Sequence, residues 1–245
     1  MAMHFTFRVF LALLVAVLPC RAREDVIDHA GKRYRVVVAR PSAVRVLWKD
    51  ETGGQLRTFT ETRAYCSRNG IIPGMLMNGG IFEPGGIPSG LCIHDGKQWT
   101  ALNAADGKGN FFLKPNGIFA IAAGKAMVLE TSEFSARAPR ASQAVQSGPM
   151  LVRNGAVHPE FRAESANLLH RNGVGIRADG MVVFAITDSR VKSRVNLHQF
   201  ASFFLSLNCR DALFLDGDIS QMWTAGMEEK PSNPFGTIVV VEGGD

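Results

Sequence analysis

The chain has 245 residues, with 27 Lys and Arg against 22 Asp and Glu, which gives a formal net charge of +5. A basic excess this mild, without a dense basic stripe, argues against nucleic acid as a partner. The length is sufficient to bury a substantial core, and no Ser/Pro-rich linker divides the chain, so we predict one folded domain.

The first 22 residues have the pattern of a secretory signal peptide. Arg8 precedes an unbroken apolar run over residues 9–18, and small residues before position 23 suit a signal peptidase. The run is about half of the ~20 residues that a membrane-spanning helix needs. We therefore predict cleavage after Ala22, a mature domain over residues 23–245, no stable membrane anchor, and a periplasmic or secreted location. A lipoprotein alternative would use Cys20, but Pro19 fits its small-residue requirement poorly.

Cleavage at this point leaves three cysteines, Cys66, Cys92 and Cys209. Cys92 lies in an apolar strand pattern, as expected for a small core residue. Cys66 and Cys209 both lie near expected helix ends, and an oxidising compartment would allow them to pair. These two are the candidates for a disulfide.

Turn signals between short apolar runs predict mostly β-structure. Asn154-Gly155 is the strongest of them, because both residues tolerate positive φ in a two-residue hairpin. In chain order, we expect a strand pair at residues 34–38 and 44–48, hairpins turning at 94–97, 123–124, 154–155 and 179–180, and a closing strand at 237–241.

Only two segments predict helices. Residues 56–68 place apolar side chains on one face and are followed by Gly70, and residues 197–207 repeat that spacing behind Asn196 as the N-cap. Many strands, few helices and no regular strand–helix alternation predict an α+β single domain with a mixed, mainly antiparallel β-sheet.

The first candidate site is the end of the apolar strand at residues 212–215, where Asp216 and Asp218 follow with one glycine between them. Carboxylates placed where a loop leaves a sheet are a common site arrangement. The alternative is an ordinary Asp-Gly turn with solvated carboxylates.

A second candidate is the loop that begins Asn78-Gly79-Gly80, after the apolar run at residues 75–77. Paired glycines let the backbone approach a ligand and direct N–H groups at an anion, and Asn78 adds an amide. The spacing matches neither a P-loop nor a dinucleotide motif, so a connector without a ligand is the alternative.

Arg171 is a third candidate, because an arginine at a strand entry suits a bidentate phosphate or carboxylate clamp. Its alternative is a solvated surface arginine. The histidines at 94, 158 and 198 are isolated and match no zinc-site spacing. Ser147 and Ser220 lack the Gly-x-Ser-x-Gly elbow, so a serine hydrolase is not supported.

Taken in order, these segments resemble the phosphodiester glycosidase family over roughly residues 34–241. The similarity lies in an Asn-Gly-Gly-Phe-Phe-like loop, a Gly-Pro-x-Leu-Val strand, an Arg-Thr-Ala-x-Gly-like segment, an Asp-Gly-Arg-like element and a Leu-Asp-Gly-Gly-Gly-Ser signature, matched here by residues 78–82, 148–152, 171–175, 188–190 and 215–220. Two departures stand out: Asp218-Ile219 replaces two glycines, and Asn172-Gly173 replaces Thr-Ala.

The resemblance implies a hydrolase that cleaves the glycosidic bond of a sugar-1-phosphodiester and releases a sugar and a phosphomonoester. Phosphate is a far better leaving group than a sugar alkoxide, so such an enzyme needs less general-acid help than an ordinary two-carboxylate glycosidase. Asp216 then acts as nucleophile, base or electrostatic stabiliser, with Asp218 or Glu83 as the second carboxylate. The residues assigned to the substrate and its phosphate are Asn78, Gly79, Gly80, Arg171, Asp188 and Ser220.

Three alternatives remain open at this stage. In the first, the two aspartates bind a divalent cation. In the second, the protein is an ordinary glycoside hydrolase of envelope glycan, and in the third it is a non-catalytic glycan-binding protein on the same fold. The enzymatic interpretation predicts that Asn78, Arg171 and Asp216 line a single cleft at one edge of the sheet, with Asp188 beside them.

Overall fold

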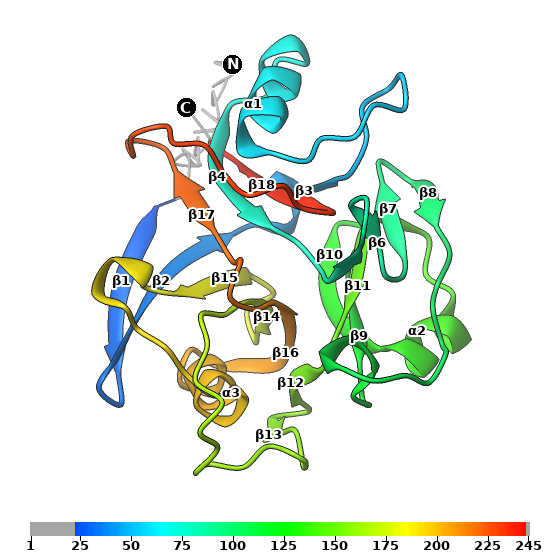
Figure 1. Cartoon of the computed structure of the whole chain (residues 1–245). Coiled ribbons are helices and arrows are strands. Elements are labelled where there is room, and N and C mark those ends of the chain that lie inside the picture. Colours follow the sequence, from blue (N-terminus) through cyan, green and yellow to red (C-terminus); the bar gives the residue numbers. More distant parts are fainter. Residues whose placement is uncertain (1–22, 244–245) are drawn as a thin grey trace, which may run out of the picture.

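The computed structural model describes residues 23–243, and every strand pairing in that range is antiparallel. Three helices accompany the strands, which confirms the predicted α+β class (Figure 1). The predicted signal peptide at residues 1–22 lies outside the described residues. Within the described range, no helix is long and apolar enough to cross a membrane.

The largest sheet has seven strands in the order β1-β2-β15-β14-β16-β12-β13. Their bounds in that order are Glu24–His29, Lys32–Ala39, Val182–Thr187, Asn172–Arg177, Cys209–Asp216, Met150–Arg153 and Ala156–Val157. The strands of this sheet come from residues 24–39 and from residues 150–216, so it joins the start of the described chain to its second half.

Two smaller sheets and a short hairpin complete the strands. The four-stranded sheet contains β17 (Met222–Thr224), β4 (Pro73–Asn78), β18 (Ile238–Glu242) and β3 (Val44–Leu47). The five-stranded sheet contains β10 (Lys125–Glu130), β9 (Gly117–Ala122), β11 (Ala141–Ser147), β7 (Cys92–His94) and β8 (Lys97–Thr100). The hairpin is β5 (Phe82–Glu83) and β6 (Ile87–Pro88).

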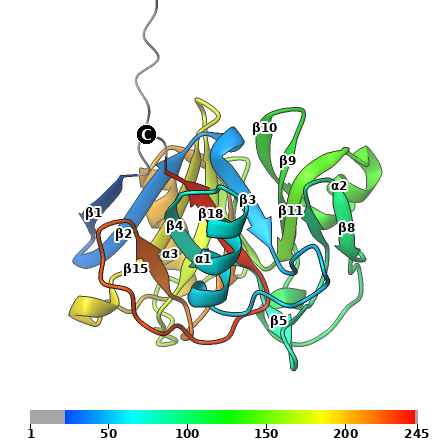
Figure 2. The ribbon, with the colours of Figure 1, turned by 90° about the horizontal axis from the view of Figure 1, so that it is seen from above.

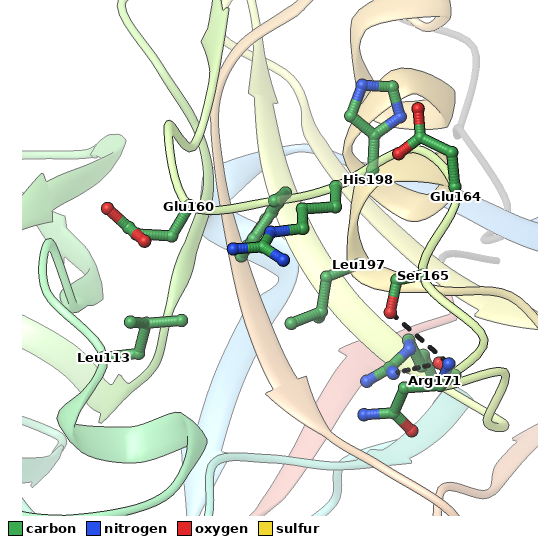
Figure 3. Close-up of a pocket in the computed structure, with 10 residues that line it drawn as sticks. Leu113, Glu160, Glu164, Ser165, Arg171, Leu197 and His198 are labelled. Carbon is green, nitrogen blue, oxygen red and sulfur yellow. Dashed lines mark hydrogen bonds between the residues drawn. The ribbon is translucent and has the colours of Figure 1, made fainter.

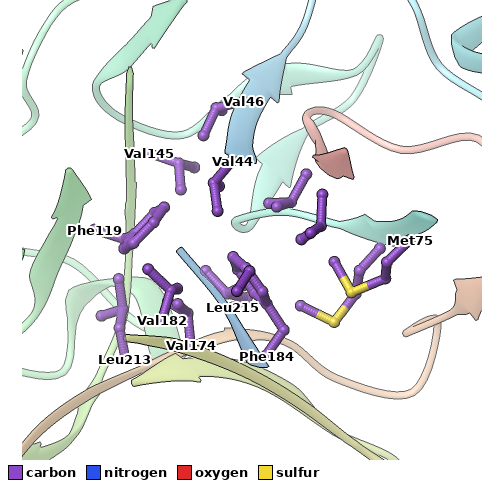
Figure 4. Close-up of a cluster of buried hydrophobic side chains, with 14 of the residues drawn as sticks. Val44, Val46, Met75, Phe119, Val145, Val174, Val182, Phe184, Leu213 and Leu215 are labelled. Atoms are coloured by element: carbon purple, nitrogen blue, oxygen red, sulfur yellow. The ribbon is translucent and has the colours of Figure 1, made fainter. Parts of the chain in front are cut away.

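One apolar core lies between the three sheets, and Figure 4 shows side chains from all of them meeting there. The two-residue alternation of strands explains the arrangement. In β18, Val239 and Val241 belong to this central core, whereas Ile238 and Val240 face the opposite side. Each sheet therefore needs a second layer on its outer face.

A single helix covers the outer face of each sheet. α1 (Phe59–Arg68) packs on the four-stranded sheet, α2 (Thr131–Arg137) on the five-stranded sheet, and α3 (Leu197–Ser206) on the seven-stranded sheet. Figure 2 shows α1 lying across β4 and β18. The central strands of each sheet are thus buried on both faces, whereas edge strands such as β1 and β8 stay partly exposed.

The helix ends follow capping chemistry. α3 begins after Asn196 as predicted, with a reciprocal capping box between Asn196 and Gln199. α1 begins at Phe59, three residues after the predicted start at residue 56, because Thr58 is the N-cap and forms a capping box with Glu61. The sequence prediction missed α2, whose seven residues are too few to show a helical repeat.

The predicted hairpins are confirmed, including Asn154-Gly155 with both residues at positive φ. The predicted early strand pair is wrong. Both segments are strands, but β2 pairs with β1 and β15 whereas β3 pairs with β18. A 3₁₀ turn at Pro41–Ala43 carries the chain from one sheet to the other, and the unrecognised turn Ala30-Gly31 supplies β1 as the partner of β2.

The proposed disulfide is also wrong, since Cys66, Cys92 and Cys209 are all free and buried. Cys66 packs in the apolar cluster under α1, whereas Cys209 packs in the cluster under α3 on a different sheet. Burial raises the pKa of the Cys66 thiol to about 11 and that of Cys209 to about 12, as expected of unreactive core residues.

Candidate functional site

Asp216 lies at the end of β16, where the seven-stranded sheet meets β4 of the four-stranded sheet. Its Oδ1 accepts a hydrogen bond from the Gly217 N–H at 2.7 Å, and its Oδ2 accepts one from Asn78 Nδ2 at 3.1 Å. Burial raises the pKa of Asp216 to about 6, because it outweighs these two donors. The carboxyl group therefore changes charge in mildly acidic solution, which suits a proton acceptor.

Asn78 is held in one orientation by its other neighbours. Its Oδ1 accepts from Asn172 Nδ2 at 3.0 Å and from the Gln221 N–H at 2.9 Å, so its Nδ2 must face Asp216. Asn172 also donates to the Asn78 carbonyl at 2.8 Å. The predicted proximity of Asn78 and Asp216 is confirmed by this network.

The pairing of β14 with β16 shifts its register at this point, where Asn172 lies opposite Asp216 and Gly173 lies opposite Phe214. Such irregularities re-aim side chains and are frequent next to active sites. The shift lets the last side chain of β16 reach β4, on the neighbouring sheet.

Gly79 and Gly80 serve packing at this junction. The Gly79 N–H donates to the Thr237 carbonyl at 2.8 Å, so it is not free for an anion. A Cβ at Gly79 would lie 2.2 Å from Thr237 Oγ1, and one at Gly80 would lie 2.7 Å from the Gln146 carbonyl. The predicted role of the Gly79 amide as an anion cradle is therefore wrong, because its N–H already has a partner. Both positions are glycine because residues 237 and 146 approach the backbone too closely for a side chain.

Two cavities open beside this network, and His170 lines both. The larger, of about 330 Å³, is also lined by Ser220 and Gln221, the latter bonded to Asn78 through its backbone. The smaller, of about 320 Å³, is also lined by Lys192, Arg194 and Asp218 among others. Asp216 and Asn78 line neither cavity themselves; Gln221, which is bonded to Asn78, reaches the larger one, and Asp218, two residues after Asp216, reaches the smaller one.

His170 was missed by the sequence prediction, which singled out its neighbour. Its Nδ1 bonds to Thr187 Oγ1, and its backbone N–H donates to Asp218 Oδ1 at 2.9 Å. Burial lowers the pKa of His170, so the ring is neutral at pH 7. The only signal in the sequence is its place beside Arg171, which does not reveal the cavity.

Ser220 is only 3% exposed, and its Oγ has no hydrogen-bond partner among the described residues. A buried hydroxyl without a partner is uncommon, and it is available to a ligand in the larger cavity. Arg190 and Lys230 also line that cavity, while Lys192 and Arg194 line the smaller one. Arg190, Arg194 and Lys230 are each ion-paired with a carboxylate, so among these described residues Lys192 is the cation left to attract an anionic ligand.

Asp218 and Asp188 are both committed to cations. Burial by itself would raise the pKa of Asp218. The His170 N–H and the Arg194 guanidinium, 3.1 Å away, outweigh burial, so the net pKa is lowered. Burial also acts to raise the pKa of Asp188. Arg190 donates to both carboxylate oxygens, at 2.8 and 3.0 Å, and the net pKa is lowered. Both carboxylates stay ionised, so neither is placed as a proton donor.

Glu83 is exposed in the β5–β6 hairpin and accepts a hydrogen bond from Ser89 Oγ at 2.8 Å. Within residues 23–243, no hydrogen bond or ion pair joins it to Asp216 or Asn78. The structure therefore gives Glu83 no part in this network. The same range holds no group of three or more His, Cys, Asp and Glu side chains arranged to bind a metal ion.

Arg171 is placed differently from the prediction. Side chains alternate along a strand, so Arg171 and Asn172 leave the chain toward opposite faces of the sheet. Arg171 Nε donates to the Val195 carbonyl at 2.8 Å and Nη2 to the Asn167 carbonyl at 3.0 Å, on the α3 side. It lines another cavity whose walls include neither Asn78 nor Asp216 (Figure 3). The single cleft predicted for the three residues is therefore not formed.

The comparisons with known proteins give one family model and one relative over most of the chain. Residues 74–242 match the family model of the phosphodiester glycosidases. The chain is 34% identical over 240 residues to the uncharacterized protein YigE of Escherichia coli K12, covering 96% of this chain and 92% of that protein.

Two solved structures share the fold. The zebrafish N-acetylglucosamine-1-phosphodiester alpha-N-acetylglucosaminidase catalytic domain, auto-inhibited by its pro-peptide, has a TM-score of 0.58 at 18% identity and matches 89% of this chain and 81% of that one. A putative exported protein from Burkholderia pseudomallei has a TM-score of 0.56 at 14% identity, covering 86% and 74%.

Proposed function

The chain belongs to the phosphodiester glycosidase family, and from that premise we propose that it is a periplasmic or secreted hydrolase of sugar-1-phosphodiesters. The observation that carries the proposal is Asp216, a half-buried carboxyl group with a raised pKa, close in the chain to Asp218 and Ser220, which line two cavities that also contain cations. The signal-peptide pattern of residues 1–22 supports the location.

In the proposed reaction, water adds to C1 of the sugar as the bond between C1 and the phosphate oxygen breaks. The phosphomonoester leaves with the electron pair of that bond. Ionised Asp216 either accepts the proton of the attacking water or stabilises the positive charge that develops on the sugar ring. The Asn78 and Gly217 donors hold the carboxylate in place for either role.

The cations of the cavity walls bind the phosphate in this proposal. Arg194 and Lys192 lie with His170 around the smaller cavity, and a guanidinium forms strong charge-assisted hydrogen bonds to phosphate oxygens. Asp188 and Asp218 act as positioning residues, because they hold Arg190 and Arg194 at the cavity walls. Ser220 Oγ is a free hydrogen-bonding group for the same ligand.

The arrangement favours this reaction over ordinary glycoside hydrolysis. Ordinary glycosidases use a pair of carboxyl groups, one of which is protonated to assist a poor leaving group. Here the other two acids assigned to catalysis are an ion-paired Asp218 and an exposed Glu83. A phosphomonoester leaves without that assistance, so one carboxylate is sufficient.

The test compares two substrates on the purified protein beginning at residue 23. We expect turnover of an N-acetylglucosamine-1-phosphodiester, and little turnover of a nitrophenyl N-acetylglucosaminide. Asp216→Asn removes the activity, whereas Asp106→Asn, on an exposed loop far from β16 in the sequence, retains it. Preference for the nitrophenyl glycoside, or binding of glycan with no turnover of either substrate, would overturn the proposal.

A further inference from the structure

The cavity that Arg171 lines has a volume of about 500 Å³. Its walls come from the first turn of α3, the loop that carries residues 160–167, and Leu113, which follows a 3₁₀ turn at Asn110–Phe112 (Figure 3). A volume of this size is within the range of small-molecule sites. Its lining shares no residue with the two cavities beside His170.

Arg171 is the most buried charged side chain in this cavity wall, with 0% exposure. Two edges of its guanidinium are held by the Val195 and Asn167 carbonyls, and the Phe214 ring centre lies 5.5 Å from Cζ. Its Nη1 has no hydrogen-bond partner among the described residues. The guanidinium is therefore fixed in orientation with one donor group left over.

No carboxylate within the described residues forms an ion pair with Arg171. Asp218 is the acid whose field acts on it, but its oxygens are bonded to Arg194 and to the His170 N–H. A charge withdrawn from water without an ionic partner is costly, and buried charges in proteins are normally paired. Burial lowers the pKa of Arg171 to about 10, so it remains protonated at neutral pH. An anionic group of a ligand would supply the missing partner.

The other residues that line the cavity indicate the chemistry of the rest of such a ligand. Glu160 and Glu164 line it and can accept hydrogen bonds from hydroxyl groups, and with Arg162 also in the wall they leave Arg171 as the one buried cation among the described residues facing the ligand. Ser165 and Asn167 add further polar groups, and Phe161 offers an aromatic face for an apolar side of a sugar ring. This combination fits a polyhydroxylated molecule with one acidic group.

We propose that the Arg171 cavity is a second binding site, separate from Asp216, for a small acidic carbohydrate whose carboxylate or phosphate group bonds to Arg171 Nη1. The two sources of the anion, a sugar acid and a sugar phosphate, share this chemistry. The site requires no step of the reaction assigned to Asp216, so it stands or falls independently of the proposed function.

Calorimetric titration of the protein beginning at residue 23 tests the site, with glucuronate and glucose 6-phosphate as the two acidic probes and glucose as the neutral control. At least one acidic probe should bind, and glucose should bind at least tenfold more weakly. Asp216→Asn should retain the affinity of the wild type. Binding of neither acid, equal binding of glucose, or loss of binding in Asp216→Asn would overturn the proposal.

Two variants locate the bound molecule. Ser165→Phe should fill the cavity and abolish binding, whereas Ser132→Phe, on the exposed surface of α2, should not. Arg171→Lys keeps the charge but loses the fixed guanidinium, so affinity should fall about tenfold to a hundredfold, as for the loss of charge-assisted hydrogen bonds. Arg177→Lys, near the other end of β14, is its control.

The Ser165→Phe result is decisive even where Arg171→Lys unfolds the protein. Its melting temperature and circular dichroism should remain those of the wild type. Unchanged affinity in a folded Ser165→Phe would place the acid elsewhere and contradict the proposal. Binding of inorganic phosphate with rejection of both sugars would contradict the carbohydrate part of it.

Discussion

Asp216 and Arg171 lie near the same end of the seven-stranded sheet, but their charges are treated in opposite ways. Asp216 receives two hydrogen bonds at a junction of two sheets, and burial still raises its pKa into the range where it exchanges protons. Arg171 is enclosed under α3 and keeps its charge, with two backbone carbonyls as partners. A titrating carboxylate suits chemistry, whereas a fixed and permanently charged guanidinium suits binding.

The largest expected effect is on the Asp216 side of this comparison. Asp216→Asn should lower kcat on the phosphodiester by about 10²–10⁴, the usual loss of a positioned acid or base. Steady-state kinetics beside the Asp106→Asn control provides the measurement. A variant with more than a third of wild-type turnover would end the assignment of Asp216 to the chemistry.

The pH profile of the wild type should follow the same carboxyl group. Because the pKa of Asp216 is raised to about 6 and the ionised form is the active one, kcat/KM should fall about tenfold per pH unit below that value. Measurements from pH 4 to 8 would check it. A rate that rises as the pH falls through this window would mean that protonated Asp216 acts instead as an acid.

Removal of the Arg171 side chain should lower the stability of the protein while leaving phosphodiester turnover nearly unchanged. Arg171→Met leaves two buried carbonyls without their donor, so the free energy of unfolding should fall by about 1–3 kcal/mol. Phosphodiester turnover should stay within about threefold, because Arg171 does not face the Asp216 network. Denaturant titration and kinetics on the folded fraction give both quantities. A specific loss of phosphodiester activity would instead restore Arg171 as the phosphate clamp.

Arg194 should show a smaller and substrate-specific effect. Its guanidinium is about half exposed, so salt and solvent weaken its attraction for phosphate. Arg194→Gln should raise KM for the phosphodiester about threefold to tenfold, with less effect in high salt. Arg210→Gln, an exposed residue of β16, is the matched control. An unchanged KM would remove Arg194 from the phosphate site.

The smallest expected effect is a gain in stability from Asp216→Asn, the same variant that is expected to lose activity. A carboxyl group with a raised folded-state pKa binds protons more tightly in the folded protein, so its contribution to stability falls as the pH rises from about 4 to 6. Asp216→Asn removes that penalty, about 3 kcal/mol for a pKa raised from 3.8 to about 6, but its amide NH₂ faces one of the two N–H donors, so the free energy of unfolding should rise by about 1 kcal/mol at pH 7 and above. Denaturant midpoints at pH 4 and pH 7.5 would reveal it, and no difference at either pH would show that Asp216 is not destabilised by burial.

Much of the local structure follows from the sequence alone. The hairpin turns, the α3 boundaries and the strand that ends at Asp216 were predictable because short-range chemistry decides them: positive φ at Asn154-Gly155, a side-chain cap at Asn196, and apolar alternation. The enzymatic interpretation predicts that Asn78 and Asp216 meet, because groups that act on one phosphate must reach it from the same pocket. Their hydrogen bond confirms that part of the candidate site.

Only the tertiary structure decided which way each side chain faces and which sheet each strand joins. Arg171 and Asn172 are adjacent in the chain, yet their side chains lie on opposite faces of the sheet, and a register shift turns Asp216 toward β4. Likewise, β3 pairs in a different sheet from β2, although only a three-residue turn joins them. Cys66 and Cys209 lie in separate apolar clusters, each covered by a different helix. Pairing and facing depend on contacts between residues far apart in the chain, and local sequence chemistry does not encode them.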